Sequence, residues 1–441
     1  MNNSRARIFG HRVVLPLVVL PSLVLAGCAP TPAPAPPSTT TSSPAPTQTP
    51  GTPAPSATSA PPSSPSSASR SPSVTPSHEP SATPTHSTKP APPAQQSPAE
   101  KTLAAMSLKE RIGQVLMVGV PATGSSAADR STIATHELGN FFLKGRSGAG
   151  TAGTASAVRR VESTISKTLS VDVDAFVATD QEGGYVQVLK GSGFSTLPTA
   201  LVQGSWATAT LRGRAESWGR QLAAAGINVN LAPVADTVPS ASFAPSNAPI
   251  GYWKREYGYN PATVSAATRA FSSGMLAAGV APVIKHFPGL GRVTKNTDIS
   301  RNVTDTKTTR HDSYLKPFKD GIAAGNDWVM VSNAYYSRID AKNIAPFSST
   351  IMRSMLREDL GFNGIIVSDD MCDAEQLAPW GLGTRALRFF EAGGTMMLCV
   401  DAPKMPAIAN ALYAKASKDP AFARLIDSAA LHVLRVKDER H

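Results

Sequence analysis

The sequence predicts a single α/β domain built as a closed (β/α)8 TIM barrel, and three observations support this prediction. Roughly 340 residues follow a low-complexity tract, a length that suits one barrel with insertions. Eight short apolar runs alternate with amphipathic helical stretches along this length. Runs that are apolar throughout, each followed by its own helix, indicate parallel strands buried on both faces, and eight of them suggest closure.

The expected strands cover residues 114–120, 139–143, 175–180, 229–234, 281–286, 328–333, 364–369 and 395–400. Expected helices include residues 207–225, 261–278 and 349–360, and the helices after the last strand end near Val436. An open sheet of the Rossmann type is the alternative fold. It is disfavoured because the first strand leads into Val118-Gly119-Val120-Pro121, which is not a Gly-rich phosphate loop.

The amino-terminal end has the pattern of a lipoprotein signal peptide. Three arginines and no acid lie in residues 1–12, and residues 13–26 form an apolar run shorter than the about 20 residues of a membrane span. The run ends in Leu25-Ala26-Gly27-Cys28, which looks like a bacterial lipobox. We therefore expect residues 1–27 to be removed and Cys28 to carry a lipid on the outer face of the cell membrane. An ordinary secretory signal is the alternative.

The next segment, residues 28–97, is expected to be a disordered linker. It consists almost wholly of Pro, Ser, Thr and Ala and has no apolar spacing that could build a core. Such a tether would hold the domain of residues 98–441 away from the membrane, within reach of the cell wall. The net charge of +11 is scattered and forms no basic stripe with interleaved aromatic residues, so nucleic acid is not an expected partner.

Only Cys372 and Cys399 remain beside Cys28 to form any disulfide. Neither shows the spacing of a metal ligand. Both lie in apolar segments, so we expect each to be a small core residue rather than a member of a redox pair.

Polar residues gather where three of the expected strands end. The third strand leads into Asp180-Gln181-Glu182-Gly183-Gly184, the fifth into Lys285-His286-Phe287-Pro288-Gly289, and the seventh into Ser368-Asp369-Asp370. The carboxyl ends of barrel strands hold the working residues of this fold. A single carboxylate there is more often a helix cap, but three clusters at one end of a barrel indicate a functional site.

With these motifs the sequence resembles glycoside hydrolase family 3 proteins, specifically the single-domain β-N-acetylglucosaminidases. The resemblance runs from about Leu103 to Val436. It rests on the three clusters above and on Asn228-Val229-Asn230-Leu231-Ala232-Pro233-Val234-Ala235-Asp236. It also rests on Gly361-Phe362-Asn363-Gly364-Ile365-Ile366-Val367, which directly precedes the Ser368-Asp369-Asp370 cluster. It implies a retaining double displacement with Asp369 as the nucleophile, which forms a covalent glycosyl-enzyme. We interpret Asp370 as a supporting or helix-capping residue.

The resemblance also implies which residues hold the substrate. Asp180 would accept hydrogen bonds from a sugar hydroxyl, and Lys285 and His286 would donate to neighbouring oxygens. Arg255 matches an arginine that the family presents to the sugar, although Tyr252 and Trp253 look like an insertion before it. A surface ion pair between Arg255 and Glu256 is the alternative for this arginine.

One loop departs from the family pattern. The acetylglucosaminidase branch usually reads Lys-His-Phe-Pro-Gly-His-Gly, followed by Asp-Ser-His or Asp-Thr-His, whose histidine is its general acid/base. Here Leu290 stands in the first histidine position, Asn296 in the aspartate position and Asp298 in the position of the catalytic histidine. Asp298 is then the expected acid/base, with Leu290 and Ile299 as apolar surroundings that raise its pKa. The alternative is that proton transfer is lost.

Two further differences concern neighbouring positions. Tyr185 and Val188 stand where the family often has arginine, so contacts beyond the first sugar are expected to differ. His311 could replace the missing base, but it begins a helix-like segment and is interpreted as a surface residue.

These observations predict an exo-acting β-glycosidase that removes N-acetylglucosamine from cell-wall, peptidoglycan-derived fragments outside the membrane. Two alternatives stay open: a β-glucosidase-like specificity on the same barrel, and a catalytically impaired lipoprotein that binds wall sugars. The expected partner is a carbohydrate, and the expected state is a monomer that contacts the membrane only through its lipid anchor. No cofactor or metal is implied, because the mechanism needs none.

Overall fold

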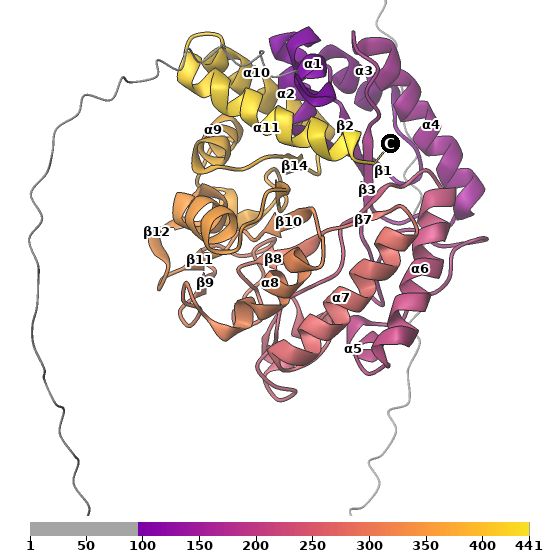
Figure 1. Cartoon of the computed structure of the whole chain (residues 1–441), viewed down its shortest axis with the longest axis vertical. Coiled ribbons are helices and arrows are strands. Elements are labelled where there is room, and N and C mark those ends of the chain that lie inside the picture. Colours follow the sequence, from indigo (N-terminus) through magenta and orange to yellow (C-terminus); the bar gives the residue numbers. More distant parts are fainter. Residues whose placement is uncertain (1–95, 441) are drawn as a thin grey trace, which may run out of the picture. The chain divides into compact units, whose positions relative to one another are not determined.

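The computed structural model describes residues 96–440. The expected signal peptide, the lipidation site Cys28 and all but the last two residues of the expected linker lie outside this range. Within it, no helix has both the length and the apolar character that a membrane crossing requires. The described residues form an α/β barrel (Figure 1), which confirms the predicted fold class.

Parallel strands form the wall of the barrel. They are β1 (Leu116–Pro121), β2 (Asn140–Lys144), β3 (Phe176–Thr179), β6 (Val229–Asn230), β7 (Ala281–Pro282), β8 (Ile284–Phe287), β10 (Trp328–Val331), β13 (Ile365–Ser368) and β14 (Met397–Cys399). Six of these pair in the order β14-β1-β2-β3-β6-β7, and the other three pair in the order β13-β10-β8. Each of the eight predicted strands has a counterpart here, because β7 and β8 are two halves of the fifth.

Two single bridges close the ring between these sheets. Val234 pairs with Lys285 and thereby joins the segment after β6 to β8, while Val367 of β13 pairs with Met396 just before β14. A closed barrel leaves no exposed sheet edge in its wall. Because the strands are parallel, the carboxyl ends of all eight lie on one rim of the barrel.

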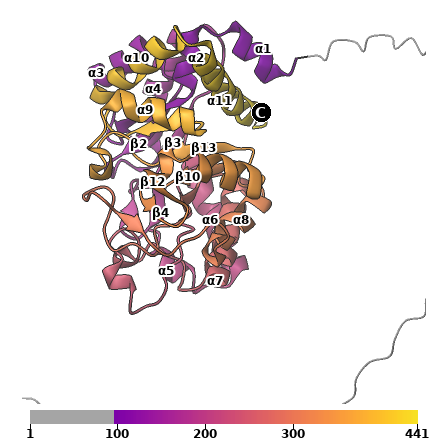
Figure 2. The ribbon, with the colours of Figure 1, turned by 90° about the vertical axis from the view of Figure 1, so that its left-hand side faces the viewer.

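Helices surround this wall (Figures 1 and 2). They are α1 (Pro98–Ala105), α2 (Leu108–Gln114), α3 (Ala127–Thr135), α4 (Gly150–Thr168), α5 (Ala200–Gln203), α6 (Thr208–Ala224), α7 (Pro261–Ala277), α8 (Lys316–Ala323), a π-helix (Thr350–Asp359), α9 (Leu382–Ala392), α10 (Met405–Ala416) and α11 (Pro420–Asp438). The three helices predicted individually begin and end within one residue of α6, α7 and the π-helix. Asn260 caps α7 and Pro261 occupies its first turn, which explains its sharp start.

The remaining short strands lie in loops between the elements of the barrel. These are β4 (Gln181–Gly183), β5 (Val186–Gln187), β9 (Thr304–Asp305), β11 (Tyr335–Tyr336) and β12 (Asp340–Ile344). β4 and β5 form an antiparallel hairpin directly after β3, and β9, β11 and β12 form a separate small sheet. Both structures extend the loops beyond the strand ends.

One end of the barrel interior is filled and covered by the chain's last helix. Inside the wall, Phe176 and Trp328 pack edge to face with ring centroids 4.8 Å apart. Val433 and Val436 of α11 join the same buried cluster. α11 also packs on α1, so the two ends of the described chain lie side by side (Figure 2). The start of β3 and β10 is thereby closed, and a cavity can form only towards the opposite, carboxyl ends of the strands.

Candidate active site

A cavity of about 400 Å³ opens at the carboxyl ends of the strands. All six residues predicted for catalysis or substrate binding line it, namely Asp180, Arg255, Lys285, His286, Asp298 and Asp369. Asp180 follows β3, Lys285 and His286 belong to β8, and Asp369 follows β13. Side chains from distant parts of the sequence meet here because parallel strands end on the same rim.

Two cations and two carboxylates form a buried network in the wall of the cavity. Lys285 Nζ donates to Asp180 Oδ1 at 2.7 Å and lies 2.6 Å from Glu182 Oε1. Arg255 makes a bidentate contact with Glu182 through Nε at 2.9 Å and Nη2 at 2.7 Å. Burial opposes the ionisation of Glu182, but Arg255 and Lys285 outweigh it and lower its pKa to about 2. Arg255 therefore pairs with Glu182 rather than with its sequence neighbour Glu256.

The role of Glu182 was not predicted from the sequence. The residue belongs to the recognised motif after β3, but a sequence does not show which acid of the motif will face the two cations. The network holds Lys285 and Arg255 in fixed positions, with their remaining donors available to a ligand.

His286 is oriented by a second carboxylate that sequence reasoning also missed. Its Nδ1 lies 2.6 Å from Asp236 Oδ2, and the backbone N–H groups of His286 and Leu290 donate to Asp236 Oδ1. Asp236 is fully buried at the end of the Asn228–Asp236 motif. Such a contact holds the ring with the proton on Nδ1. The other ring nitrogen, Nε2, lies 3.4 Å from Arg255 Nη2 on the cavity side.

Asp369 and Asp370 occupy different environments although they are adjacent. Asp369 lines the cavity, and its Oδ1 accepts the backbone N–H of Asp370 at 2.8 Å. The Asp370 carboxylate accepts three backbone N–H groups, from Cys372, Asp373 and Val400, at 3.0, 2.7 and 3.0 Å. Burial raises the pKa of Asp370 to about 6 despite these bonds. The contacts fit the supporting role expected for Asp370.

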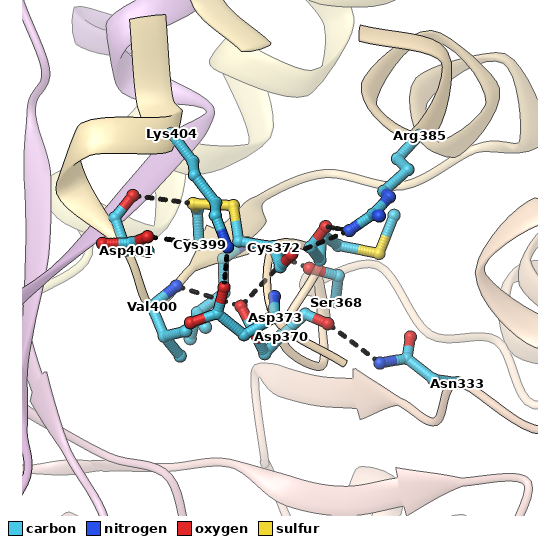
Figure 3. The surroundings of a disulfide bond; sticks show 12 residues. Asn333, Ser368, Asp370, Cys372, Asp373, Arg385, Cys399, Val400, Asp401 and Lys404 are labelled. Carbon is cyan, nitrogen blue, oxygen red and sulfur yellow. Dashed lines mark hydrogen bonds and ion pairs between the residues drawn. A yellow bond between two sulfur atoms is a disulfide. The ribbon is translucent and has the colours of Figure 1, made fainter. Parts of the chain in front are cut away.

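The two cysteines of the domain form a disulfide bond, which corrects the prediction that they are separate core residues. Cys372 and Cys399 lie 27 positions apart, with their Cα atoms 5.1 Å apart (Figure 3). Both are buried as expected, but the sequence alone does not show that the loop after β13 meets the end of β14. The bond fixes the loop that follows Asp369. Arg385 supports the same loop by donating to the carbonyl oxygens of Met371 and Cys372.

The loop that carries Asp298 is attached to this same segment. The carbonyl oxygen of Asp298 accepts the backbone N–H of Glu375 at 3.0 Å, and that of Thr297 accepts the N–H of Gln376 at 3.0 Å. Asn296 Oδ1 accepts the backbone N–H of Asp298 at 3.0 Å. These bonds hold Asp298 in the lining of the cavity, near enough to Asp369 for the two charges to interact.

The surroundings of Asp298 favour its protonated form. Although the residue keeps contact with solvent, crowding by protein atoms raises its pKa, and the charge of Asp369 raises it further. Arg255 and His286 act in the opposite direction but do not cancel these effects. Leu290 is buried and lines the cavity as predicted, whereas Ile299 is 78% exposed. The prediction of an apolar neighbour was therefore wrong for Ile299, which is exposed to solvent and does not line the cavity.

The other sequence candidates lie outside the cavity. His311 is exposed in a separate depression beside Arg310 and Lys316. Val188 is buried in the core, while Tyr185 is exposed. Over residues 96–440, no group of three or more His, Cys, Asp or Glu side chains is placed to hold a metal ion.

Glu256, next to Arg255, gives a prediction about stability. Its side chain is inaccessible to solvent, and burial raises its pKa to about 7. Between pH of about 4 and this value the folded state binds more protons than the unfolded state, so stability falls as pH rises. We expect Glu256→Gln to raise the free energy of unfolding by about 1–3 kcal/mol at pH 8, and much less at pH 5. Chemical denaturation at both pH values measures the difference.

The exposed Glu358→Gln serves as the matched control for this change and should have the same small effect at both pH values. A gain from Glu256→Gln that is equal at pH 5 and pH 8 would show that ionisation of Glu256 does not oppose folding.

The closed barrel, with Asp298 and Asp369 in the lining of one cavity at its strand ends, is compatible with a glycoside hydrolase, which works with a pair of carboxyl groups. The profile of the glycosyl hydrolase family 3 N terminal domain matches residues 107–436. The chain belongs to this family. This confirms the predicted enzyme class.

Several proteins with related names are similar to the chain. A β-hexosaminidase of Methylococcus capsulatus is 34% identical over 251 residues, which cover 55% of this chain and 72% of that protein. The crystal structure of a β-N-acetylhexosaminidase from Beutenbergia cavernae is 47% identical, with a TM-score of 0.75 over 76% of this chain and 99% of that one. The structure of a family 3 β-N-acetylglucosaminidase from Paenibacillus is 26% identical, with a TM-score of 0.69 over 76% of this chain and 63% of that one. The chain is thus a β-N-acetylhexosaminidase-like glycosidase.

Proposed function

We propose that the protein is a retaining exo-β-N-acetylglucosaminidase that acts on cell-wall, peptidoglycan-derived sugars. The observation that carries this proposal is the placement of Asp369 and Asp298 in the lining of one cavity, together with the anchored Lys285, His286 and Arg255. The names of the similar enzymes from Beutenbergia cavernae and Paenibacillus, which specify N-acetylated sugars, support the choice of an acetamido sugar.

In the first step Asp369 attacks the anomeric carbon while Asp298 protonates the departing oxygen. The glycosidic bond breaks, the leaving group departs as an alcohol, and the sugar remains as an ester of Asp369. In the second step Asp298, now ionised, takes a proton from water. The water oxygen forms a bond to the anomeric carbon, and the Asp369 carboxylate is released.

Asp180, Lys285, His286 and Arg255 are the proposed substrate-binding residues. The ion pairs described above fix the two cations, so little side-chain entropy is lost when a hydroxyl binds them. Their buried setting strengthens each hydrogen bond to a sugar oxygen.

We further propose that the enzyme works outside the membrane and is anchored through Cys28. The lipobox-like Leu25-Ala26-Gly27-Cys28 supports this location. The disulfide between Cys372 and Cys399 supports it independently, because such bonds persist in oxidising compartments.

The experiment that tests the proposed function compares two aryl glycosides at equal concentration. We expect the protein to release nitrophenol from the β-N-acetylglucosaminide and much more slowly from the β-glucoside. Faster release from the glucoside would assign a β-glucosidase-like specificity instead. Release from neither would favour a lipoprotein that only binds wall sugars.

A further inference from the structure

Three aromatic side chains form an exposed cluster beside the cavity. Tyr185, Tyr252 and Trp253 are 58, 59 and 41% exposed, and they supply three of the seven large hydrophobic side chains that are exposed among the described residues. The Trp253 ring centroid lies 5.5 Å from that of Tyr185 and 4.9 Å from that of Tyr252, both edge to face. Single exposed hydrophobic residues are common on protein surfaces, whereas a contiguous group of them often marks a binding site.

The cluster is continuous with the wall of the cavity. Tyr185 directly precedes Val186, which lines the cavity on the β4–β5 hairpin. Tyr252 and Trp253 lie in a 3-10 turn between Pro249 and Arg255, both of which line the cavity as well. Two separate segments that supply residues to the cavity lining thus meet in one aromatic cluster next to it.

The backbone holds both segments in place. Asn247 is fully buried, and its Oδ1 accepts the backbone N–H of Gly251 at 2.7 Å, while its Nδ2 donates to the carbonyl oxygens of Leu290 and Val293. On the other side, Arg146 Nη2 donates to the carbonyl oxygen of Tyr185 at 2.8 Å. The backbone that carries the three aromatic side chains is therefore held in place before any ligand arrives, which reduces the entropy lost on binding.

We infer that Tyr185, Tyr252 and Trp253 bind the sugar ring that follows the one held in the cavity, so that the preferred substrate is an oligosaccharide chain. This inference rests on the proposed function. Pyranose rings present apolar C–H faces that stack on aromatic rings, and the two tyrosine hydroxyls can bond sugar oxygens. Three side chains are too few for a stable protein interface, which buries about 800 Å² per partner.

The test measures equilibrium binding to the full-length protein with Asp369→Asn, so that no ligand is cleaved. We compare N-acetylglucosamine with the β-1,4-linked trisaccharide of the same sugar. We expect the trisaccharide to bind about tenfold more tightly, and Trp253→Ala to remove most of this difference while the Kd of the monosaccharide stays within twofold. Trp253→Phe, which keeps an aromatic face, should preserve most of the gain.

The matched control is Tyr413→Ala, which removes another exposed aromatic residue, on α10, and should change neither Kd. A trisaccharide Kd that Trp253→Ala leaves unchanged would overturn the inference; so would a parallel loss of monosaccharide affinity in both Trp253→Ala and Tyr252→Ala. Hydrolysis of the aryl N-acetylglucosaminide by the wild type is measured separately. Failure of the proposed function is thereby distinguished from failure of the aromatic subsite.

Discussion

Replacement of Asp369 with asparagine is expected to lower kcat for the aryl N-acetylglucosaminide by roughly 10,000-fold or more, because the covalent step loses its nucleophile. Asparagine has nearly the same shape, and its side-chain oxygen can still accept the backbone N–H of Asp370. The protein should therefore fold as the wild type does, with an unchanged denaturation midpoint. Steady-state kinetics and thermal unfolding measure the two effects.

Asp373→Asn is the matched control, since Asp373 lines the same cavity but forms an ion pair with Lys404 at its edge. We expect this variant to keep most of the activity. A fluorosugar that traps the glycosyl-enzyme should add its mass to the peptide that contains Asp369. A label on another carboxylate would contradict the assignment.

The sequence predicted the strands of the barrel well, because continuous apolar runs mark strands buried on both faces. The errors in this prediction concern the residues at which regular strand pairing begins or ends. Residues 229–234 were expected to form one strand, but regular pairing ends at Asn230 and resumes only at the Val234 bridge. Pro233 lies between them and has no N–H group to donate to a neighbouring strand. The first strand was expected to begin at Gln114, but that residue ends α2, which a capping box at Ser107 and Glu110 starts.

The six candidate residues could be named because the resemblance to the family assigns a role to each of them. Four of them also lie in motifs at strand ends, which face one rim of a barrel. Their partners could not be predicted, since contacts across the barrel depend on side-chain directions that no local pattern specifies. Glu182 shows this: it is buried between Lys285 and Arg255, which lie 103 and 73 positions away in the sequence. The disulfide shows it again, because Cys372 and Cys399 meet only when β13 and β14 close the barrel.

Asp298→Ala is expected to have an effect that depends on the leaving group. For the trisaccharide, whose departing oxygen needs a proton, kcat/KM should fall by about 100- to 10,000-fold. An aryl glycoside with a good leaving group needs little help in the first step, so the glycosyl-enzyme should accumulate. Azide, which needs no general base, should then restore turnover and give the β-glycosyl azide after two inversions at the anomeric carbon.

Two comparisons make this result specific to Asp298. With Asp369→Ala, azide replaces the nucleophile itself and should give the α-glycosyl azide by a single inversion, so the configuration of the product distinguishes the two carboxylates. His311→Ala, at the exposed alternative base, should behave as the wild type. If azide has no effect on Asp298→Ala and its activity on the trisaccharide is unchanged, Asp298 is not the acid/base.

The pH dependence of activity also reports on the role of Asp298. Desolvation by the surrounding protein and the charge of Asp369 raise the pKa of Asp298, so its acid form persists to higher pH than that of an ordinary aspartate. Activity on the trisaccharide should therefore fall as pH rises through this pKa, because the proton donor is lost. The residual activity of Asp298→Ala on the same trisaccharide should not show this fall, whereas a purely structural role of Asp298 would leave the shape of the pH profile unchanged.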